Sequence, residues 1–239
     1  MCGMPQQDQN KLEDRAITTL MRFQVHTVAD RWWAFGQMPQ ASKALEDTTG
    51  MRFAKLLGSG GGKGFAPWPD WGTYFLLQTW DRAAEAERFV EKHPYSQEWQ
   101  SRSASTSVLW LQAYRSMGAW EASNPFQGQD GPNDAAHTVI LTRARIRARR
   151  LLHFWRSVPK VSDMMSGQPG LCYAKGVGEW PLIDQATVSV WESEAAVNAF
   201  AYQGAQHAEV IRKTRHWGWY KEELFARFAL VSQSGSPLF

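Results

Sequence analysis

A motif that occurs twice, 120 residues apart, constrains the fold of this chain more than any other feature. The pattern Gly50-x-x-x-Ala54-Lys55-x-x-Gly58 returns as Gly170-x-x-x-Ala174-Lys175-x-x-Gly178, and Pro39-x-x-Ser42 returns as Pro159-x-x-Ser162. After a glycine-rich insertion in the first copy the offset shortens to 111, where Trp80 corresponds to Trp191 and Phe89 to Phe200. Two motifs at one spacing are not expected by chance, so one structural unit of the chain is present twice.

Each copy predicts the same order of elements from its apolar periodicity, namely strand, helix, strand, strand, helix, strand. In the first copy the expected strands are 21–28, 51–57, 74–80 and 108–114, and the expected helices are 31–45 and 83–102. In the second copy the expected strands are 138–145, 171–177, 186–191 and 224–231, and the expected helices are 148–165 and 194–217. This order is the ferredoxin-like βαββαβ motif, and two such modules can cover each other's sheets. The predicted fold class is therefore α+β, with two tandem ferredoxin-like modules forming a fused dimeric α/β-barrel.

The element order also sets the expected domain boundaries. An N-terminal module over 17–115 and a C-terminal module over 137–232 are joined by a linker at 116–136, where Gly, Pro, Asn and Asp cluster. Residues 1–16 are polar and lack the apolar segment of a secretory signal, so we expect a disordered leader there. Residues 233–239 are expected to form a tail.

Composition excludes several classes of protein. The 26 Lys and Arg against 23 Asp and Glu give a net charge of +3, which is too mild to indicate a nucleic-acid partner. Cys2 and Cys172 alone exclude a disulfide framework and a CxxC metal site, and favour a reducing, cytoplasmic setting. No apolar run is long enough to span a bilayer. The 13 tryptophans fit either a core and helix–sheet interface or a cavity for a large flat or polyene ligand.

Short catalytic motifs are missing from the sequence. The stretch Gly58–Gly64 does not match a Walker loop, because Lys63 is followed by glycine and the next element is expected to be a strand. We interpret this stretch as a flexible loop at the barrel rim, a candidate lid. The G-x-S-x-G, H-E-x-x-H and EF-hand patterns are absent, so hydrolase and metalloprotease chemistry has no support.

His207 is the histidine whose position points towards an apolar interior. It shares a helical stripe with Phe200 and Ile211, and small residues precede it. It is either a core histidine hydrogen-bonded to a neighbour or an axial ligand of haem iron. A ligating histidine needs an acceptor for its other ring nitrogen, and Glu222 or Glu223 could provide one. Glu222 is preferred because, in a strand with alternating faces, it lies on the same face as the apolar residues Leu224, Ala226 and Phe228.

The remaining histidines are expected on polar faces or at the ends of elements. His153 and His216 share helical faces with basic residues and are expected to be solvated. His93 precedes Pro94 and is expected to cap a helix or lie in a loop. His137 begins a strand, and His26 lies either on the surface or in the barrel lining.

The arginine-rich segment Arg143–Arg150 is most simply the solvated start of a helix. The alternatives are contact with a membrane surface, or salt bridges from residues such as Arg143 to haem propionates.

Four longer strings carry a resemblance to a known family. They are FAKLLGSG at Phe53–Gly60, HFWRSVP at His153–Pro159, GVGE at Gly176–Glu179 and WYKEELFARF at Trp219–Phe228. These strings resemble the spheroidene monooxygenase family, and the resemblance extends over residues 17–232. It departs in the first ten residues and in the loop Gly60–Trp71, which bears on the identity of the substrate.

The resemblance implies an O2-dependent enzyme containing haem b that oxidises the end group of an acyclic carotenoid. In that family a methylene beside a methoxy group becomes a ketone by successive hydroxylations, chemistry that needs a cofactor. His207 lies where such sequences place a histidine before an Ile-Arg run, which implies the iron ligand, while Lys175 and Gln185 are expected on the distal side. The implied partners are a lipophilic substrate, O2 and an electron donor such as a ferredoxin. Only the end of a carotenoid is expected to enter, so a peripheral contact with the inner membrane follows; homo-oligomerisation is left open.

Two other readings of the sequence stay open. One is a haem enzyme of the same architecture with peroxidase, chlorite dismutase-like or aldoxime dehydratase-like chemistry. The other is a cofactor-free module that binds a small ligand in a tryptophan-rich cavity. A Soret band after haem reconstitution separates the haem enzymes from the cofactor-free module.

Overall fold

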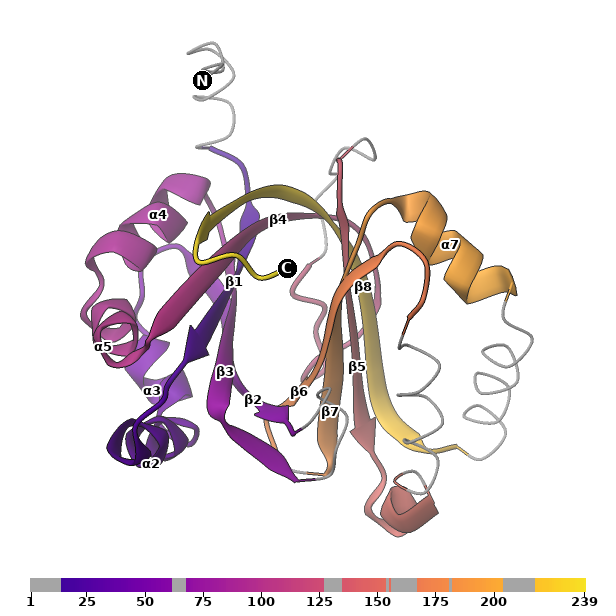
Figure 1. Cartoon of the computed structure of the whole chain (residues 1–239), viewed down its shortest axis with the longest axis horizontal. Coiled ribbons are helices and arrows are strands. Elements are labelled where there is room, and N and C mark those ends of the chain that lie inside the picture. The colour runs from indigo at the N-terminus through magenta and orange to yellow at the C-terminus, as the bar shows by residue number, and fades with distance from the viewer. Residues whose placement is uncertain are drawn as a thin grey trace.

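The computed structural model describes residues 14–61, 68–126, 135–153, 155, 167–180, 182–203 and 218–239. The fold is α+β: eight antiparallel strands close into a barrel, and helices lie outside it (Figure 1). Around the barrel the strands follow the order β1-β3-β2-β6-β7-β5-β8-β4. Their bounds are β1 Ile17–Gln24, β2 Met51–Gly60, β3 Pro69–Trp80, β4 Ser105–Gly118, β5 Thr138–Ile146, β6 Leu171–Gly178, β7 Asp184–Trp191 and β8 Tyr220–Gly235.

The strand order is the same in both halves of the chain. The first half runs β4-β1-β3-β2 and the second runs β8-β5-β7-β6, so each half places its fourth strand beside its first. The halves meet along β4 and β8, and again where Gly58 of β2 pairs with Gly178 of β6. The repeated sequence motif therefore ends at this second junction. A Cβ on Gly178 would lie 2.3 Å from the carbonyl oxygen of Asp184, which explains the need for glycine there.

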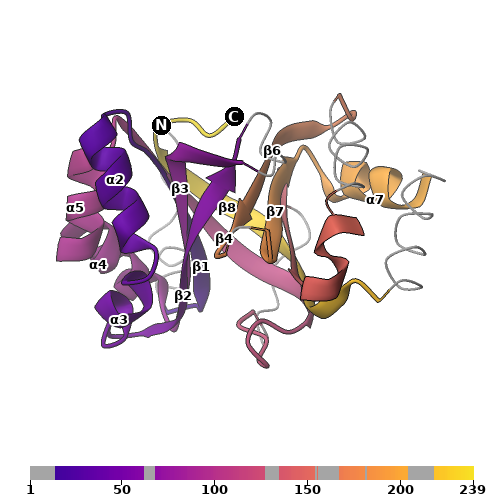
Figure 2. The ribbon, with the colours of Figure 1, turned by 90° about the horizontal axis from the view of Figure 1, so that it is seen from below.

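Helices cover the outside of the barrel on opposite sides (Figure 2). The first half carries α2 (Val28–Gln37), α3 (Ala41–Leu45), α4 (Ala83–Lys92) and α5 (Pro94–Arg102). The second half carries the 3-10 turn η1 (Ala148–Arg150) and α7 (Glu194–Gln203). The residues expected to continue these two helices, 156–166 and 204–217, lie outside the described residues.

Two expected helices are each divided by a proline. The expected helix 83–102 is α4 and α5, because Pro94 lacks the N–H that would continue α4. His93 caps α5 by accepting a hydrogen bond from the Tyr95 amide at 3.2 Å, which confirms the capping role expected for it. The expected helix 31–45 is likewise α2 and α3, separated by a turn that contains Pro39.

Among the described residues the core has two large parts, one inside the barrel and one under the helices of the first half, and a smaller third cluster around Ile140, Trp191 and Val197 beside α7. The interior is filled from both halves by residues such as Leu20, Phe75, Val188 and Phe228. The outer core of the first half includes the fully buried Trp80 and Trp99. Buried tryptophans confirm the core interpretation for part of the set, whereas a second group is exposed: Trp32, Trp68, Trp71 and Trp180.

Candidate functional site

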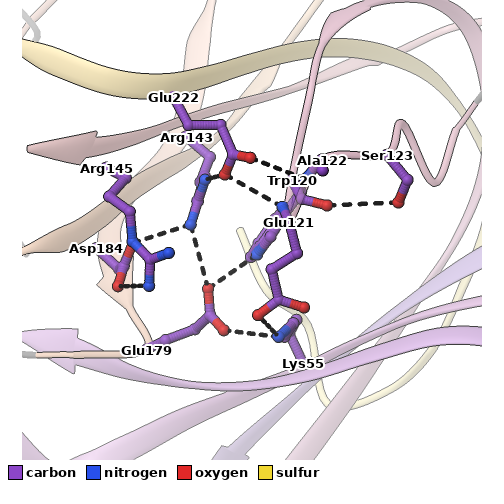
Figure 3. A network of polar contacts seen from close by, with 10 residues as sticks. All are labelled: Lys55, Trp120, Glu121, Ala122, Ser123, Arg143, Arg145, Glu179, Asp184 and Glu222. Carbon is purple, nitrogen blue, oxygen red and sulfur yellow. Dashed lines mark hydrogen bonds and ion pairs between the residues drawn. The ribbon is translucent and has the colours of Figure 1, made fainter.

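A network of charged side chains lies inside the barrel where β4 and β5 end and β7 and β8 begin (Figure 3). Its centre is Arg143 of β5, whose side chain is only 1% exposed. The guanidinium lies 2.9 Å from the Asp184 carboxylate and also contacts the carboxylate of Glu222. Arg145 binds the same Asp184 from the other side at 2.9 Å. Buried charges of this kind are stable only when they are paired, so the network must fold as a unit.

A strained turn follows β4 and is held by this network. Trp120 and Ser123 exchange backbone hydrogen bonds, and the two residues between them, Glu121 and Ala122, have φ of 55° and 65°. Such mirror-image turns usually contain Asn-Gly, because the left-handed region costs about 1–2 kcal/mol for other residues. Glu222 accepts hydrogen bonds from both strained amides, at 3.1 and 2.9 Å. These bonds offset part of the strain.

The turn places the Trp120 indole in the barrel interior. The side chain is buried, its Nε1 donates to Glu179 at 2.8 Å, and the guanidinium of Arg143 lies 5.1 Å from the ring centroid. Trp120 also packs edge-on against Phe53, with ring centroids 5.2 Å apart. The segment after β4 is thus anchored inside the barrel by one aromatic ring and its polar edge.

The two repeated lysines make reciprocal contacts between the halves. Lys55 of β2 lies 2.9 Å from Glu179, which follows β6, and Lys175 of β6 lies 3.1 Å from Asp70 of β3. Each lysine therefore binds a carboxylate of the other half. Burial alone would lower the pKa of Lys55, but its bonds to Glu121 and Glu179 outweigh burial and raise that pKa.

The pKa of Glu222 gives the network a dependence on pH. Burial alone would raise it, but hydrogen bonds from Ala122 and Glu121 and the charge of Arg143 together lower it below its usual value. A carboxylate with a lowered folded-state pKa stabilises the fold above its unfolded-state pKa, and this stabilisation is lost as pH falls through the folded value. We expect Glu222→Gln to lower the urea midpoint at neutral pH, with a difference from wild type that shrinks below about pH 4.

The control for this measurement is Glu223→Gln, since Glu223 is the exposed neighbour on the opposite face of β8. In the haem-free protein its urea midpoints should follow those of the wild type throughout the titration. A Glu222→Gln deficit that is equal at neutral and acidic pH would contradict the assignment.

Each half of the barrel contributes four neighbouring strands, here called the first and the second sheet, and the outer faces of these two sheets differ at matching positions. In the first sheet a cross-strand row consists of Met21, Leu76 and Leu56, all buried beneath helices. The same register in the second sheet gives the row Thr142, Thr187 and Gly176. The next row changes from Phe23 and Tyr74 to Ala144 and Gln185. We call the four short residues of these second-sheet rows, Thr142, Thr187, Gly176 and Ala144, the small-residue shelf.

The shelf side chains are shorter than the large apolar side chains at the matching positions of the first half. Thr142 is exposed and Thr187 is half-buried, whereas their counterparts Met21 and Leu76 are fully buried. At one edge of the shelf the outer face is packed, because Trp191 contacts Phe200 of α7 with ring centroids 5.2 Å apart. A flat group placed over the shelf would meet short side chains, whereas the matching positions of the first half carry large apolar residues that pack under its helices.

The structure separates the sequence-predicted site residues into two faces. Lys175 and Glu222 point into the barrel, where each is ion-paired. Gln185 and Glu223 lie on the outer face, in the row of Ala144. Lys175 and Gln185 are therefore not brought together. His207 lies outside the described residues, four positions after the last residue of α7, and its role as iron ligand stays a prediction.

The interpretation of Arg143–Arg150 as a solvated helix start is wrong for its first residues. Arg143 to Ile146 belong to strand β5, and Arg143 is buried. A helix-like turn begins only at Ala148. Because Arg143 is held by Asp184 and Glu222, it does not fit the alternative of a propionate-binding cation on the outer face.

The histidines in the described part of the chain are found mostly where they were expected. His26 is exposed after β1. His137 precedes β5 and contacts the ring of Phe239. His153 is exposed, as expected, but its Nδ1 also accepts a hydrogen bond from the Trp219 indole at 3.0 Å. His216 lies outside the described residues.

Sequence reasoning missed most of the interior network. Lys55 was visible as part of the repeat and of the FAKLLGSG string, and Glu179 only as part of the GVGE string. Asp184 and Trp120 gave no signal of their own, because their partners are distant in the chain. Arg143 lies on the same strand face as the apolar residues Val139 and Leu141, and this alternation could have indicated its burial.

Among the described residues, no group of three or more His, Cys, Asp or Glu side chains is arranged to hold a metal ion. None of the helices in the described ranges is both long and apolar enough to cross a bilayer.

Comparison with known proteins identifies relatives along nearly the whole chain. The chain is 36% identical to spheroidene monooxygenase from Rhodobacter capsulatus over 92% of both chains. It is 31% identical to the Cereibacter sphaeroides enzyme of that name, over 91% of this chain and 67% of that one. The Rubrivivax gelatinosus enzyme is 30% identical over 87% of this chain and 79% of that protein. No family model matches the chain.

Solved structures support the fold. A crystal structure of aldoxime dehydratase superposes with a TM-score of 0.60 at 13% identity, covering 92% of this chain and 83% of that chain. A second aldoxime dehydratase, in complex with butyraldoxime, also gives 0.60, at 11% identity, over 90% and 79%. At these identities the likeness concerns the fold alone. The sequence relatives carry the classification: this chain belongs to the spheroidene monooxygenase family and is an oxidoreductase of the monooxygenase type.

Proposed function

We propose that this protein is a haem-dependent monooxygenase that uses O2 to oxidise the end group of an acyclic carotenoid or a similar lipophilic molecule. The structural observation that carries the cofactor assignment is the replacement of Met21, Leu76 and Leu56 by Thr142, Thr187 and Gly176 in the second half. Family membership supports the oxygen chemistry and a small-molecule substrate.

The small-residue shelf supports a haem in the second half rather than in the first. Haem is a flat group that needs an apolar or weakly polar surface along its face, and two threonines, an alanine and a glycine supply one. When bound, the haem supplies the activation of O2, which side chains cannot perform. His207 is the proposed iron ligand. Of the two candidate acceptors for its second ring nitrogen, Glu223 is favoured, because Glu222 is engaged inside the barrel.

The other residues of the site have positioning roles in this proposal. Gln185 is half-buried on the same outer face and offers an amide that can hydrogen-bond a polar end group. Arg227, also on this face, is held by Glu194 at 2.7 Å and Asn198 at 3.0 Å, which ties α7 to β8. Lys175 holds the junction between the halves through Asp70.

Further parts of the proposal concern partners and architecture. An electron donor such as a ferredoxin delivers reducing equivalents, and the protein reaches its lipophilic substrate at the inner membrane. The two halves are tandem ferredoxin-like modules in a fused dimeric α/β-barrel, a proposal supported by their identical strand order and by the sequence repeat. The boundaries 17–115 and 137–232 stay predictions.

The decisive experiment combines cofactor loading with product analysis. Purified protein is titrated with haemin, and a Soret band with saturable stoichiometry is expected. The loaded protein is then given a reductant, isotopically labelled O2 and an acyclic carotenoid, and mass spectrometry is expected to find the label in the product. No Soret band would overturn the haem assignment. A haem protein that dehydrates an aldoxime without consuming O2, and leaves the carotenoid unlabelled, would favour the dehydratase chemistry instead.

A single substitution tests the shelf directly. Thr187→Leu installs the side chain found at the matching position of the first sheet, and we expect it to weaken haem binding at least about tenfold by filling the space. The thermal midpoint of the haem-free protein should not fall. The same substitution at the half-buried Thr106→Leu, on the outer face of the first sheet, is the control and should leave haem binding unchanged. Equal haem binding by Thr187→Leu and wild type would place the haem elsewhere.

A further inference from the structure

Helix α2 carries apolar side chains on the face that points away from the barrel. Val28, Trp32 and Phe35 are 70%, 67% and 45% exposed, and their spacing places them on one stripe of the helix. Trp71, at the start of β3, is 41% exposed and lies beside them, with its ring 6.1 Å from that of Trp32 and 4.8 Å from that of Phe35. We call these four residues the aromatic patch.

The aromatic patch is not needed to attach α2 to the barrel. The opposite face of the helix does this, through the fully buried Ala34 and through Trp33, whose ring centroid lies 4.8 Å from that of Trp99. A surface helix normally turns polar residues to water. Here a second apolar stripe is exposed. Its Trp32 and Phe35 lie beside Trp71 of β3, so two tryptophans and a phenylalanine form one exposed cluster. Exposed aromatic clusters of this kind are typical of interaction surfaces.

The charges around the patch favour an anionic partner. The nearby carboxylate of Asp30 is ion-paired with Arg102 at 3.3 Å, and that of Asp70 with Lys175 at 3.1 Å. The adjacent Arg31 is exposed on α2. Both acids beside the patch are thus neutralised by local partners, whereas a cation faces solvent. The net charge of +3 has the same sign.

We propose that the aromatic patch docks the protein onto the surface of an anionic phospholipid bilayer. Tryptophan is suited to the membrane–water interface, because its ring is apolar and its N–H finds polar partners there. Four side chains from one helix and one strand end are too few for a stable contact between two copies of the chain, which needs about 800 Å² on each partner. A bilayer needs only a few aromatic anchors and nearby basic charge. The inference deepens the proposed function, since it names the surface from which a lipophilic substrate is reached.

Vesicle flotation of the full chain tests this surface. Wild-type protein is mixed with phosphatidylcholine vesicles with and without phosphatidylglycerol, and it is expected to float with the anionic vesicles, less so at high salt. The double variant Trp32→Ala/Phe35→Ala should lose binding by about tenfold or more, because membrane affinity scales with the apolar area inserted. Arg31→Glu should weaken binding to anionic vesicles only. Trp180→Ala removes a tryptophan that is 65% exposed on the β6–β7 turn, and as the matched control it should float like the wild type.

The outcomes separate docking from its alternatives. Failure of the wild type to float, or equal flotation of wild type and double variant, would overturn the proposal. A wild-type dimer that the double variant dissociates, with no flotation of either, would show that the patch joins two copies instead. The haem content of the double variant should equal that of the wild type. Flotation by a wild-type protein that binds no haem would refute the proposed function while leaving the docking surface standing.

Discussion

Replacing His207 with alanine is expected to abolish stable haem binding by the purified protein. An axial ligand contributes more to metal affinity than the residues that merely orient it, whose loss already costs about 10–100-fold. We therefore expect a Soret band reduced by at least that factor at equal haemin concentration, and no turnover of an acyclic carotenoid. Optical titration with haemin and mass spectrometry of the products measure the two effects.

Two controls show whether His207 acts as a ligand or supports the fold. His26→Ala removes an exposed imidazole from the segment that follows β1 and should bind haem as the wild type does. Added imidazole should restore a Soret band to His207→Ala, because a free imidazole can occupy the space of the missing side chain. Wild-type haem content in His207→Ala would end the assignment. Loss of haem together with loss of the folded barrel, without rescue, would mean that the histidine belongs to the core.

The second large effect is expected in the interior network. Arg143→Met leaves the carboxylates of Asp184 and Glu222 inside the barrel without their shared cation. Removing one partner of a buried ion pair typically costs about 3–5 kcal/mol, so we expect the free energy of unfolding to fall by that amount. Urea denaturation followed by circular dichroism measures it.

Arg145→Met is a closely matched control for this effect. Arg145 binds the same Asp184 carboxylate at 2.9 Å, but its side chain is 36% exposed. Its loss should therefore cost less than about 1 kcal/mol. Combining Arg143→Met with Asp184→Asn should recover part of the stability, because it removes one of the two buried carboxylates that have lost Arg143. Equal costs for Arg143→Met and Arg145→Met would show that burial does not control the strength of the network.

The positions of the strands could be predicted because the barrel interior is apolar at alternate residues. Their ends could not, since polar segments such as the end of β8, up to Gly235, join the sheet by backbone pairing with β4. Composition gives no sign of such pairing. Arg143 was misread for a related reason: an arginine in an alternating stretch indicates a solvated segment unless its partners are known, and Asp184 and Glu222 are far away in the sequence.

The face of the sheet on which each site residue lies could have been predicted from the sequence. In the hairpin of β6 and β7, Gly178 pairs with Gln185, so Gln185 lies on the face of the even-numbered residues of β6. Lys175 then points to the other face. What sequence alone could not show is why the lysine recurs in both copies. The structure answers this, because Lys55 and Lys175 each reach a carboxylate of the opposite half.

The pairing of β4 with β8 has a consequence for how the barrel is made. Ser107 of β4 pairs with Gly235, so the ladder joins segments separated by more than half of the chain. During synthesis β4 keeps an unpaired edge until β8 has left the ribosome, and unpaired edges are prone to intermolecular association. Contacts at such separations also slow folding. Yield of the recombinant protein should therefore depend on temperature and chaperone supply during expression more than on the equilibrium stability of the finished barrel.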